Sequence, residues 1–149
     1  MLSITRASES ASGPIGLLPL SLLLREQTAE LHRYAEQKLG FPDAITNVTE
    51  YGSCLERFYR LYRPLEIDLA RFGQWPTIGI ERAERQHAGR LARDLEALGK
   101  SPLQLADAPI ESLPVLSGFS HALGALYVLE GSTLGSQFIL RHLTSFLGD

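Results

Sequence analysis

The chain has 149 residues, a formal net charge of −3, 44% hydrophobic and 21% charged side chains, a composition typical of a single globular domain. Its slight acidic excess argues against nucleic-acid binding, because a surface that neutralises phosphates needs surplus lysine and arginine. The single cysteine, Cys54, excludes an intramolecular disulfide and a multi-cysteine metal site, and it is typical of a reducing, cytoplasmic setting.

The N-terminal end is expected to be a flexible tail over residues 1–17, because it is rich in serine and poor in side chains that could be buried. The apolar run at 15–24 is too short, and too interrupted by Pro19 and Ser21, to cross a bilayer. It continues into a helical pattern with no cleavage-like site, so we interpret it as the beginning of a helix and expect no membrane association. Residues 18–149 are then expected to form one helical domain.

Two long helices are predicted in the first half of the chain. From 20 to 39, leucine, alanine and threonine recur at spacings of three and four, which is one face of an α-helix, and Gly40 ends the pattern. A second helix is predicted to begin at a cap supplied by Asn47 or Thr49 and to run to about 69. Pro64 lies inside this second pattern and should kink the helix or begin a new one.

The second half of the chain predicts further helices. One should span about 80–98, with His87 on its buried stripe as an ordinary core histidine and Gly99 as the glycine that ends it. After a proline-rich loop, a last helix or pair of helices should cover 115–147. No segment alternates polar and apolar residues as a β-strand does, so the chain is predicted to be all-α, a helical bundle.

One candidate for chemistry is His32, with Glu36 one turn later on the same helix face. A neutral imidazole can bind iron through one ring nitrogen while a carboxylate accepts a hydrogen bond from the other and orients the ring. The alternative is a histidine on a helix surface beside a charged neighbour, and the spacing alone does not decide between them.

A second candidate is the sequence GSTLGS at 131–136, where Gly131 and Gly135 leave one helix face bare and Ser136 follows. Each glycine costs about 1 kcal/mol relative to alanine inside a helix, so something should compensate. The helix could pack closely on another helix, the glycines could separate two helices, or a flat ligand could lie against the backbone. From the residues alone, close helix packing is the simplest of the three.

The remaining chemically interesting side chains give weaker signals. Cys54 is expected to be a small buried residue, and the carboxylates of Glu66 and Asp68 are expected to be solvated on the second helix. His121 and His142 have no acidic or cysteine partner at the spacing of a metal site.

Three segments together resemble the heme oxygenase family. The sequence LREQTAELHRYAE at 24–36 resembles the proximal helix of that family, with its pattern L-(R/K)-x-x-T-x-x-x-H-x-x-x-E. The sequence LGALYVLEGSTLGS at 123–136 resembles the distal helix of bacterial members, close to those associated with phytochromes. Between them, LARDLEALG at 91–99 resembles a third family segment, so the match covers about 20–143 in the right order.

The resemblance implies an all-α heme oxygenase fold in which His32 is the axial iron ligand and Glu36 is its hydrogen-bonded partner. It implies a heme site on the bare distal face, with heme as both cofactor and substrate and with biliverdin, carbon monoxide and ferrous iron as products. The residues it assigns to heme binding are Arg25, Thr28, Glu36, Tyr127, Gly131 and Gly135, and those it assigns to catalysis are Gly131, Ser132, Gly135 and Tyr62.

The resemblance also implies partners. Dioxygen is a co-substrate, and the electrons come from a separate donor, which is a ferredoxin-like or flavodoxin-like protein or a reductase. A bacterial phytochrome is the implied acceptor of biliverdin.

The chain departs from the family pattern in three ways. Ser132 stands where animal-type members carry an acidic residue that organises distal water, and Ser136 replaces the last glycine of the usual pair. The family normally continues for one or two helices beyond the distal helix, so we expect a bundle that is incomplete at its C-terminal end and can form a homodimer through exposed apolar surface. A heme-binding protein without turnover and an interaction module that kept only the fold are the alternatives.

Overall fold

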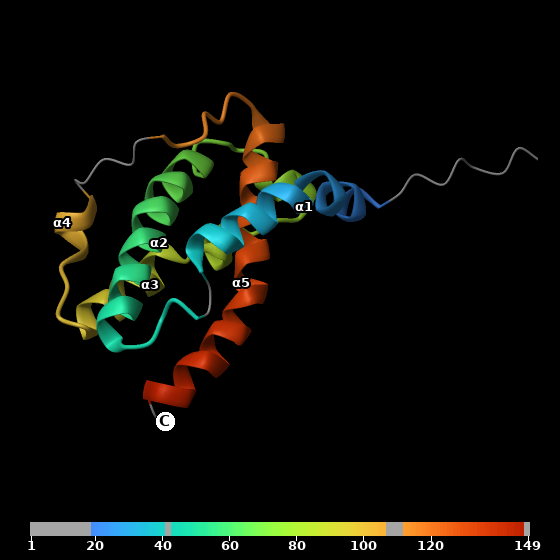
Figure 1. Cartoon of the computed structure of the whole chain (residues 1–149). Helices are drawn as coiled ribbons and strands as arrows, with labels where there is room; N and C mark the ends of the chain where they lie inside the picture. Colours follow the sequence, from blue (N-terminus) through green and yellow to red (C-terminus); the bar gives the residue numbers. More distant parts are fainter. Residues whose placement is uncertain (1–18, 41–42, 107–111, 148–149) are drawn as a thin grey trace, which may run out of the picture. The chain divides into compact units, whose positions relative to one another are not determined.

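The structure, a computed structural model, describes residues 19–40, 43–106 and 112–147, without the side chains of 21, 106, 133–139 and 145–147. Every regular element within these ranges is a helix, which confirms the all-α class (Figure 1). The tail predicted for 1–17 lies outside the described residues. The chain divides into two compact units, residues 1–39 and 40–149.

The first unit contains helix α1, Leu20–Leu39, at the predicted position. Within it, the hydroxyl of Thr28 donates a hydrogen bond to the carbonyl of Leu24, one turn earlier, at 2.8 Å. Gly40 follows the helix with a φ of 63°, the left-handed conformation that glycine adopts most readily. The predicted helix end at Gly40 is therefore confirmed.

Helix α2, Val48–Leu69, begins at a cap built from side chains around its first turn. The backbone N–H of Glu50 donates to Asn47 Oδ1 at 2.9 Å, and the Glu50 carboxylate accepts from the N–H of Thr46 at 2.7 Å. These bonds satisfy backbone donors that have no partner inside the helix, so Asn47 rather than Thr49 is the cap. Pro64 lies inside α2 and does not begin a new helix.

Helix α2 is the centre of the second unit, where it contacts α3 (Ala88–Ala97), α4 (Pro102–Ala106) and α5 (Phe119–Leu147), as Figure 1 shows. Two apolar clusters join these helices. The buried side chains that join α2 to α5 are Tyr62, Leu65, Leu69, Trp75, Ala122, Leu126 and Leu129. Those that join α2 to α3 are Leu55, Tyr59 and Leu95.

Trp75 lies in the first cluster, in the short 3-10 helix η1, Trp75–Ile78, that follows α2. Its indole N–H donates to the carbonyl of Leu69 at 2.9 Å, and its ring meets that of Phe119 edge-on at 4.8 Å between centroids. The indole thus caps the end of α2 and packs against the start of α5, which is why a large polar-tipped ring can be buried there.

The prediction of one helix over about 80–98 is wrong for the first half of that range. That part contains the 3-10 helix η2, Arg82–Arg85, and α3 begins only at Ala88. The backbone N–H groups of His87 and Ala88 donate to the carboxylate of Glu66 on α2, so a contact between distant residues sets the start of the helix. The end is as predicted, because Gly99 follows the helix with a φ of 72°. The segment 115–147 contains one continuous helix, α5.

Cys54 is partly buried on α2, and burial raises the pKa of its thiol to about 11, so the thiol remains protonated at neutral pH.

None of the helices that the structure describes combines the length and the apolarity needed to span a bilayer.

We predict that Leu95→Ala destabilises the second unit by about 2–5 kcal/mol, because Leu95 is fully buried between α2 and α3 and the substitution leaves a cavity. Chemical denaturation, followed by the fluorescence of Trp75, measures this loss, since Trp75 is the only tryptophan and lies in the same unit. Leu103→Ala is the control, because Leu103 is 79% exposed and its truncation should change stability by no more than about 0.5 kcal/mol. Equal losses in the two variants would contradict the assignment of the core.

Candidate functional site

Two residues assigned to the site, Tyr62 on α2 and Ser132 on α5, lie in contact. The hydroxyl oxygens of Tyr62 and Ser132 lie 3.2 Å and 2.7 Å from the carbonyl of Leu129, which can accept from either. The two hydroxyls are also within hydrogen-bond distance of each other. Because each has a single proton, one donates to the carbonyl while the other donates either to that carbonyl or to its partner hydroxyl. The structure therefore brings together a buried phenol and an exposed serine that are 70 positions apart in the chain.

Gly131, next to Ser132, is exposed. Within the second unit as described, a Cβ atom built on Gly131 would meet nothing within 4 Å, so no helix of that unit packs closely there. Helix α5 also runs without a break through both glycines, so the glycines do not separate two helices. Within the described part of the second unit, neither close helix packing nor a helix break therefore explains Gly131. The surroundings of Gly135 and Ser136 lie outside the described residues.

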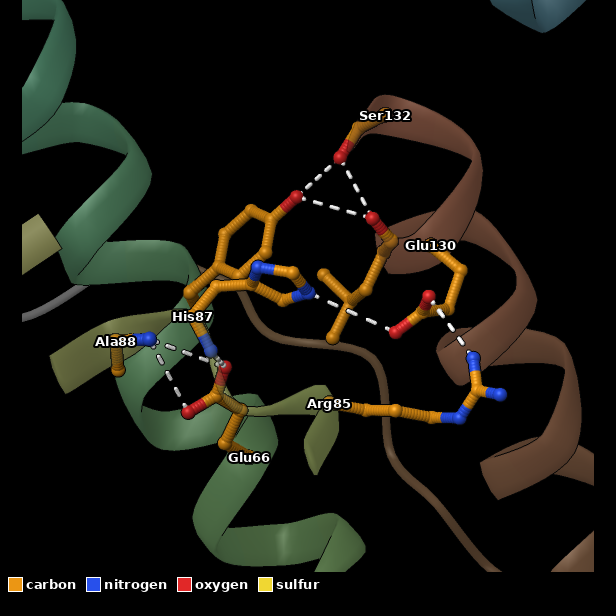
Figure 2. A network of polar contacts seen from close by, with 8 residues as sticks. Glu66, Arg85, His87, Ala88, Glu130 and Ser132 are labelled. Atoms are coloured by element: carbon orange, nitrogen blue, oxygen red, sulfur yellow. Dashed lines mark hydrogen bonds and ion pairs between the residues drawn. The ribbon is translucent and has the colours of Figure 1, made fainter. Parts of the chain in front are cut away.

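Glu66 is the one buried charged side chain among the described residues, contrary to the expectation that it is solvated. Its carboxylate accepts hydrogen bonds from the N–H groups of His87 at 2.6 Å and of Ala88 at 3.2 Å (Figure 2). The carboxylate thereby satisfies backbone donors at the positive end of α3. The signal for its burial was its spacing, since Glu66 follows Tyr62 by one turn on the apolar face of α2.

His87 is an N-terminal neighbour of α3 rather than a member of a helical stripe, and its side chain is 18% exposed. Its ring meets the ring of Tyr62 edge-on, with centroids 5.7 Å apart. Its Nε2 lies 3.6 Å from Oε1 of Glu130, while Oε2 of Glu130 lies 3.1 Å from Nη1 of Arg85. Figure 2 shows the side chains of Arg85 and His87 directed at Glu130. Glu130 was not singled out from the sequence, because these partners lie more than 40 positions away in the chain.

Tyr62 ionises with difficulty in this setting. Burial, the largest cause, raises the pKa of its phenol, and the nearby carboxylates of Glu66 and Glu130 raise it further. The hydrogen bond with Ser132 acts in the opposite direction and lowers the pKa. The phenol is thus a neutral hydrogen-bond donor and acceptor at physiological pH.

The proposed iron ligand and its partner lie on α1. Nε2 of His32 is 3.3 Å from Oε1 of Glu36, so the two side chains share one face of the helix, with 73% and 62% of their surfaces exposed. Arg25 is exposed on the same helix, and Thr28 is half-buried with its hydroxyl bonded to the backbone. The imidazole therefore has a carboxylate beside it to orient the ring.

The other assigned or candidate side chains lie at separate places on α5. Tyr127, assigned to heme binding, is 38% exposed. Nδ1 of His121 lies 2.8 Å from the hydroxyl of Ser117, and Nε2 of His142 lies 2.9 Å from the carbonyl of Ile45. Both histidines have partners near the ends of α5, away from the Tyr62–Ser132 contact.

The residues present fit the flat, iron-containing ligand that the sequence resemblance implies. Helix α1 offers an exposed imidazole paired with a carboxylate, and α5 offers a stretch of backbone at Gly131 that no described side chain of its unit covers. The hydroxyls of Tyr62 and Ser132 lie beside that stretch and can hydrogen-bond water or a polar ligand atom.

The chain is thus an all-α protein whose first unit carries an imidazole beside a carboxylate and whose second unit carries an open backbone stretch beside two hydroxyls. The family model described as Heme oxygenase matches residues 18–147, nearly the whole chain. The chain belongs to the heme oxygenase family, and this membership supports a role in binding or degrading heme. A search of curated proteins and a search of solved structures each found no match.

We predict that one tyrosine, Tyr62, ionises above the ordinary value of about 10. The difference in absorbance at alkaline pH between the wild type and Tyr62→Phe isolates this phenol from the other tyrosines. Ser132→Ala should raise the pKa of Tyr62 further, because it removes the hydrogen bond that lowers it, and Glu130→Gln should lower it, because it removes a negative charge. A pKa at or below 10 in the wild type would contradict the burial of the phenol.

Proposed function

We propose that this chain is a heme oxygenase in which His32 would bind the heme iron and the α5 backbone at Gly131 and Gly135 would lie against the porphyrin. The observation that carries the proposal is the bare surface at Gly131, beside the hydroxyls of Tyr62 and Ser132, in a chain of this family. A helical glycine costs about 1 kcal/mol relative to alanine, and no close helix contact in its unit explains Gly131.

Each remaining residue assigned to the site has a stated role in this proposal. Glu36 accepts a hydrogen bond from the imidazole of His32 and so fixes the orientation of the ring. The guanidinium of Arg25 pairs with a propionate of the heme, Thr28 contacts the heme one turn before His32, and the ring of Tyr127 borders the porphyrin.

The bound heme supplies the iron that activates dioxygen and the porphyrin carbon that is oxidised, with biliverdin, carbon monoxide and ferrous iron as products. The chain holds the proton donors on the distal side. Ser132 is an exposed residue whose hydroxyl exchanges a proton with water in this proposal, and the phenol oxygen of Tyr62 can accept a hydrogen bond from Ser132 or donate one to it. This pair takes the place of the acidic residue of animal-type members.

Two protein partners belong to the proposal. An external electron donor, a ferredoxin-like or flavodoxin-like protein or a reductase, provides the electrons, as in the family that the chain belongs to. The likeness of 123–136 to bacterial members associated with phytochromes favours a phytochrome as the acceptor of biliverdin.

We predict that purified wild-type protein binds added heme with a Soret absorbance change, and that His32→Ala shifts the band and weakens affinity at least about tenfold, because the iron loses its axial nitrogen. His121→Ala is the matched control, since His121 is also an exposed histidine but lies at the start of α5. Equal spectra and affinities in both variants would reject His32 as the ligand.

Turnover is tested on the same samples by adding a reductant and dioxygen. Appearance of the biliverdin spectrum in the wild type, and its loss in His32→Ala, is the expected result. Heme that stays intact in the wild type, with either chemical or protein reductants, would leave a heme-binding protein without oxygenase activity. Absence of any heme binding would reject the proposed function as a whole.

We predict that Gly131→Leu folds at least as stably as the wild type but loses heme affinity. The new side chain enters open space and gains about 1 kcal/mol of helix propensity, yet it occupies the surface against which the porphyrin lies. Thermal unfolding measures the first effect and heme titration the second. Gly89→Leu is the control, because Gly89 is also a helical glycine at which an added Cβ atom would meet nothing within 4 Å, but it lies on α3. Unchanged heme affinity in Gly131→Leu would contradict the role of this surface.

A further inference from the structure

One turn of α5 forms hydrogen bonds and ion pairs with two other elements of its unit. From α2, Tyr62 reaches the carbonyl of Leu129 and the hydroxyl of Ser132. From the segment that precedes α3, Arg85 and His87 reach the carboxylate of Glu130. Gly131 lies between Glu130 and Ser132 in the chain, and an added Cβ atom on it would meet no neighbour in the described part of the unit.

Glu130 has a separate cationic or ionisable partner for each carboxylate oxygen. Oε2 lies 3.1 Å from the guanidinium of Arg85, and Oε1 lies 3.6 Å from Nε2 of His87. The side chains of Glu130, Arg85 and His87 are 30%, 43% and 18% exposed. Because the pair with His87 is mostly withdrawn from solvent, salt screens it less than it screens a surface ion pair.

His87 is held in place by contacts that do not involve Glu130. Its position therefore restricts the position of the Glu130 side chain. Its backbone N–H donates to the Glu66 carboxylate, and its ring lies edge-on against Tyr62. The guanidinium of Arg82 donates to the backbone carbonyl of Glu66 at 3.1 Å and ties the same segment to α2. The titratable and charged groups that face His87 are Glu130 from α5, Glu66 and Tyr62 from α2, and Arg85 and Arg82 from its own segment.

We propose that Glu130 is a positioning residue for the proposed heme site: Arg85 and His87 hold its carboxylate, and this clamp fixes the turn of α5 that carries Gly131 and Ser132. Removing either partner should loosen this turn, because each carboxylate oxygen of Glu130 then loses the side chain that it faces. The effect on heme rests on the proposed function, but the clamp exists in the heme-free protein.

The first experiment uses the full chain without heme. Amide resonances of Gly131 and Ser132 are compared by NMR at one pH, and Glu130→Gln, Arg85→Gln and His87→Gln should each shift both resonances from their wild-type positions. Glu56→Gln is the matched control, because Glu56 also forms a partly exposed ion pair, with Lys100 at 2.6 Å, away from α5. Resonances of Gly131 and Ser132 that stay unchanged in Glu130→Gln and Arg85→Gln would overturn the clamp.

The second experiment measures heme affinity. Glu130→Gln should weaken binding about two- to fivefold, the range that couplings of partly exposed ion pairs produce, and Glu56→Gln should not. His87→Gln should also weaken binding, because it removes the ring that faces Oε1 of Glu130. Arg85→Lys keeps the cation and should bind like the wild type, whereas Arg85→Gln should resemble Glu130→Gln; this second pair tests the clamp even if Glu130→Gln fails to fold.

The two proposals fail in different ways. If the wild type binds no heme but the Glu130 and Arg85 variants shift the resonances of Gly131 and Ser132 in the heme-free protein, the proposed function is wrong and the clamp is real. If the wild type binds heme with an affinity that neither His87→Gln nor the Arg85 variants alter, the heme site stands and the positioning role of Glu130 is wrong.

Discussion

The candidate site depends on two side chains one turn apart on α2. Tyr62 reaches forward to the carbonyl of Leu129 on α5, and Glu66 reaches to the N–H groups at the start of α3. A carboxylate buried without partners would be strongly unfavourable, so Glu66 must meet those donors, and the donors at a helix start must meet an acceptor. This mutual requirement sets where α3 begins. It also sets where His87, the residue before α3, presents its ring.

The turn of α5 around Gly131 therefore has one side that is bonded to neighbouring elements and one side that is open. Hydrogen bonds and ion pairs fasten Leu129 and Glu130 to α2 and to the segment before α3, while the glycine surface has no close neighbour in the described part of its unit. Such an arrangement combines a rigid support with an open surface, as a preorganised binding site requires. The hydroxyls of Tyr62 and Ser132 lie at the border between the two sides and are the polar groups nearest the open surface that the contacts identify.

Family membership indicates the ligand of this protein, whereas the geometry indicates how its residues are held. The match over 18–147 places the chain among heme oxygenases and so supports heme as the ligand. The pairing of His32 with Glu36 is a local property of α1, produced by the four-residue spacing of an α-helix. The network around Glu130 is instead a property of the second unit. It involves residues that the sequence resemblance did not assign to the site, and it accounts for the position of residues that the resemblance did assign.

The amino-acid sequence by itself determined what short-range physics controls: the all-α class, the bounds of α1, a cap of α2 at either Asn47 or Thr49, and the glycine ends at Gly40 and Gly99. Helical periodicity and capping act within a few residues, so they can be read directly from the chain. Tertiary structure alone decided the late start of α3, the burial of Glu66 and the partners of Glu130. Each of these follows from a buried or partly buried charge meeting a partner from a distant segment, and no local pattern encodes which distant group that will be.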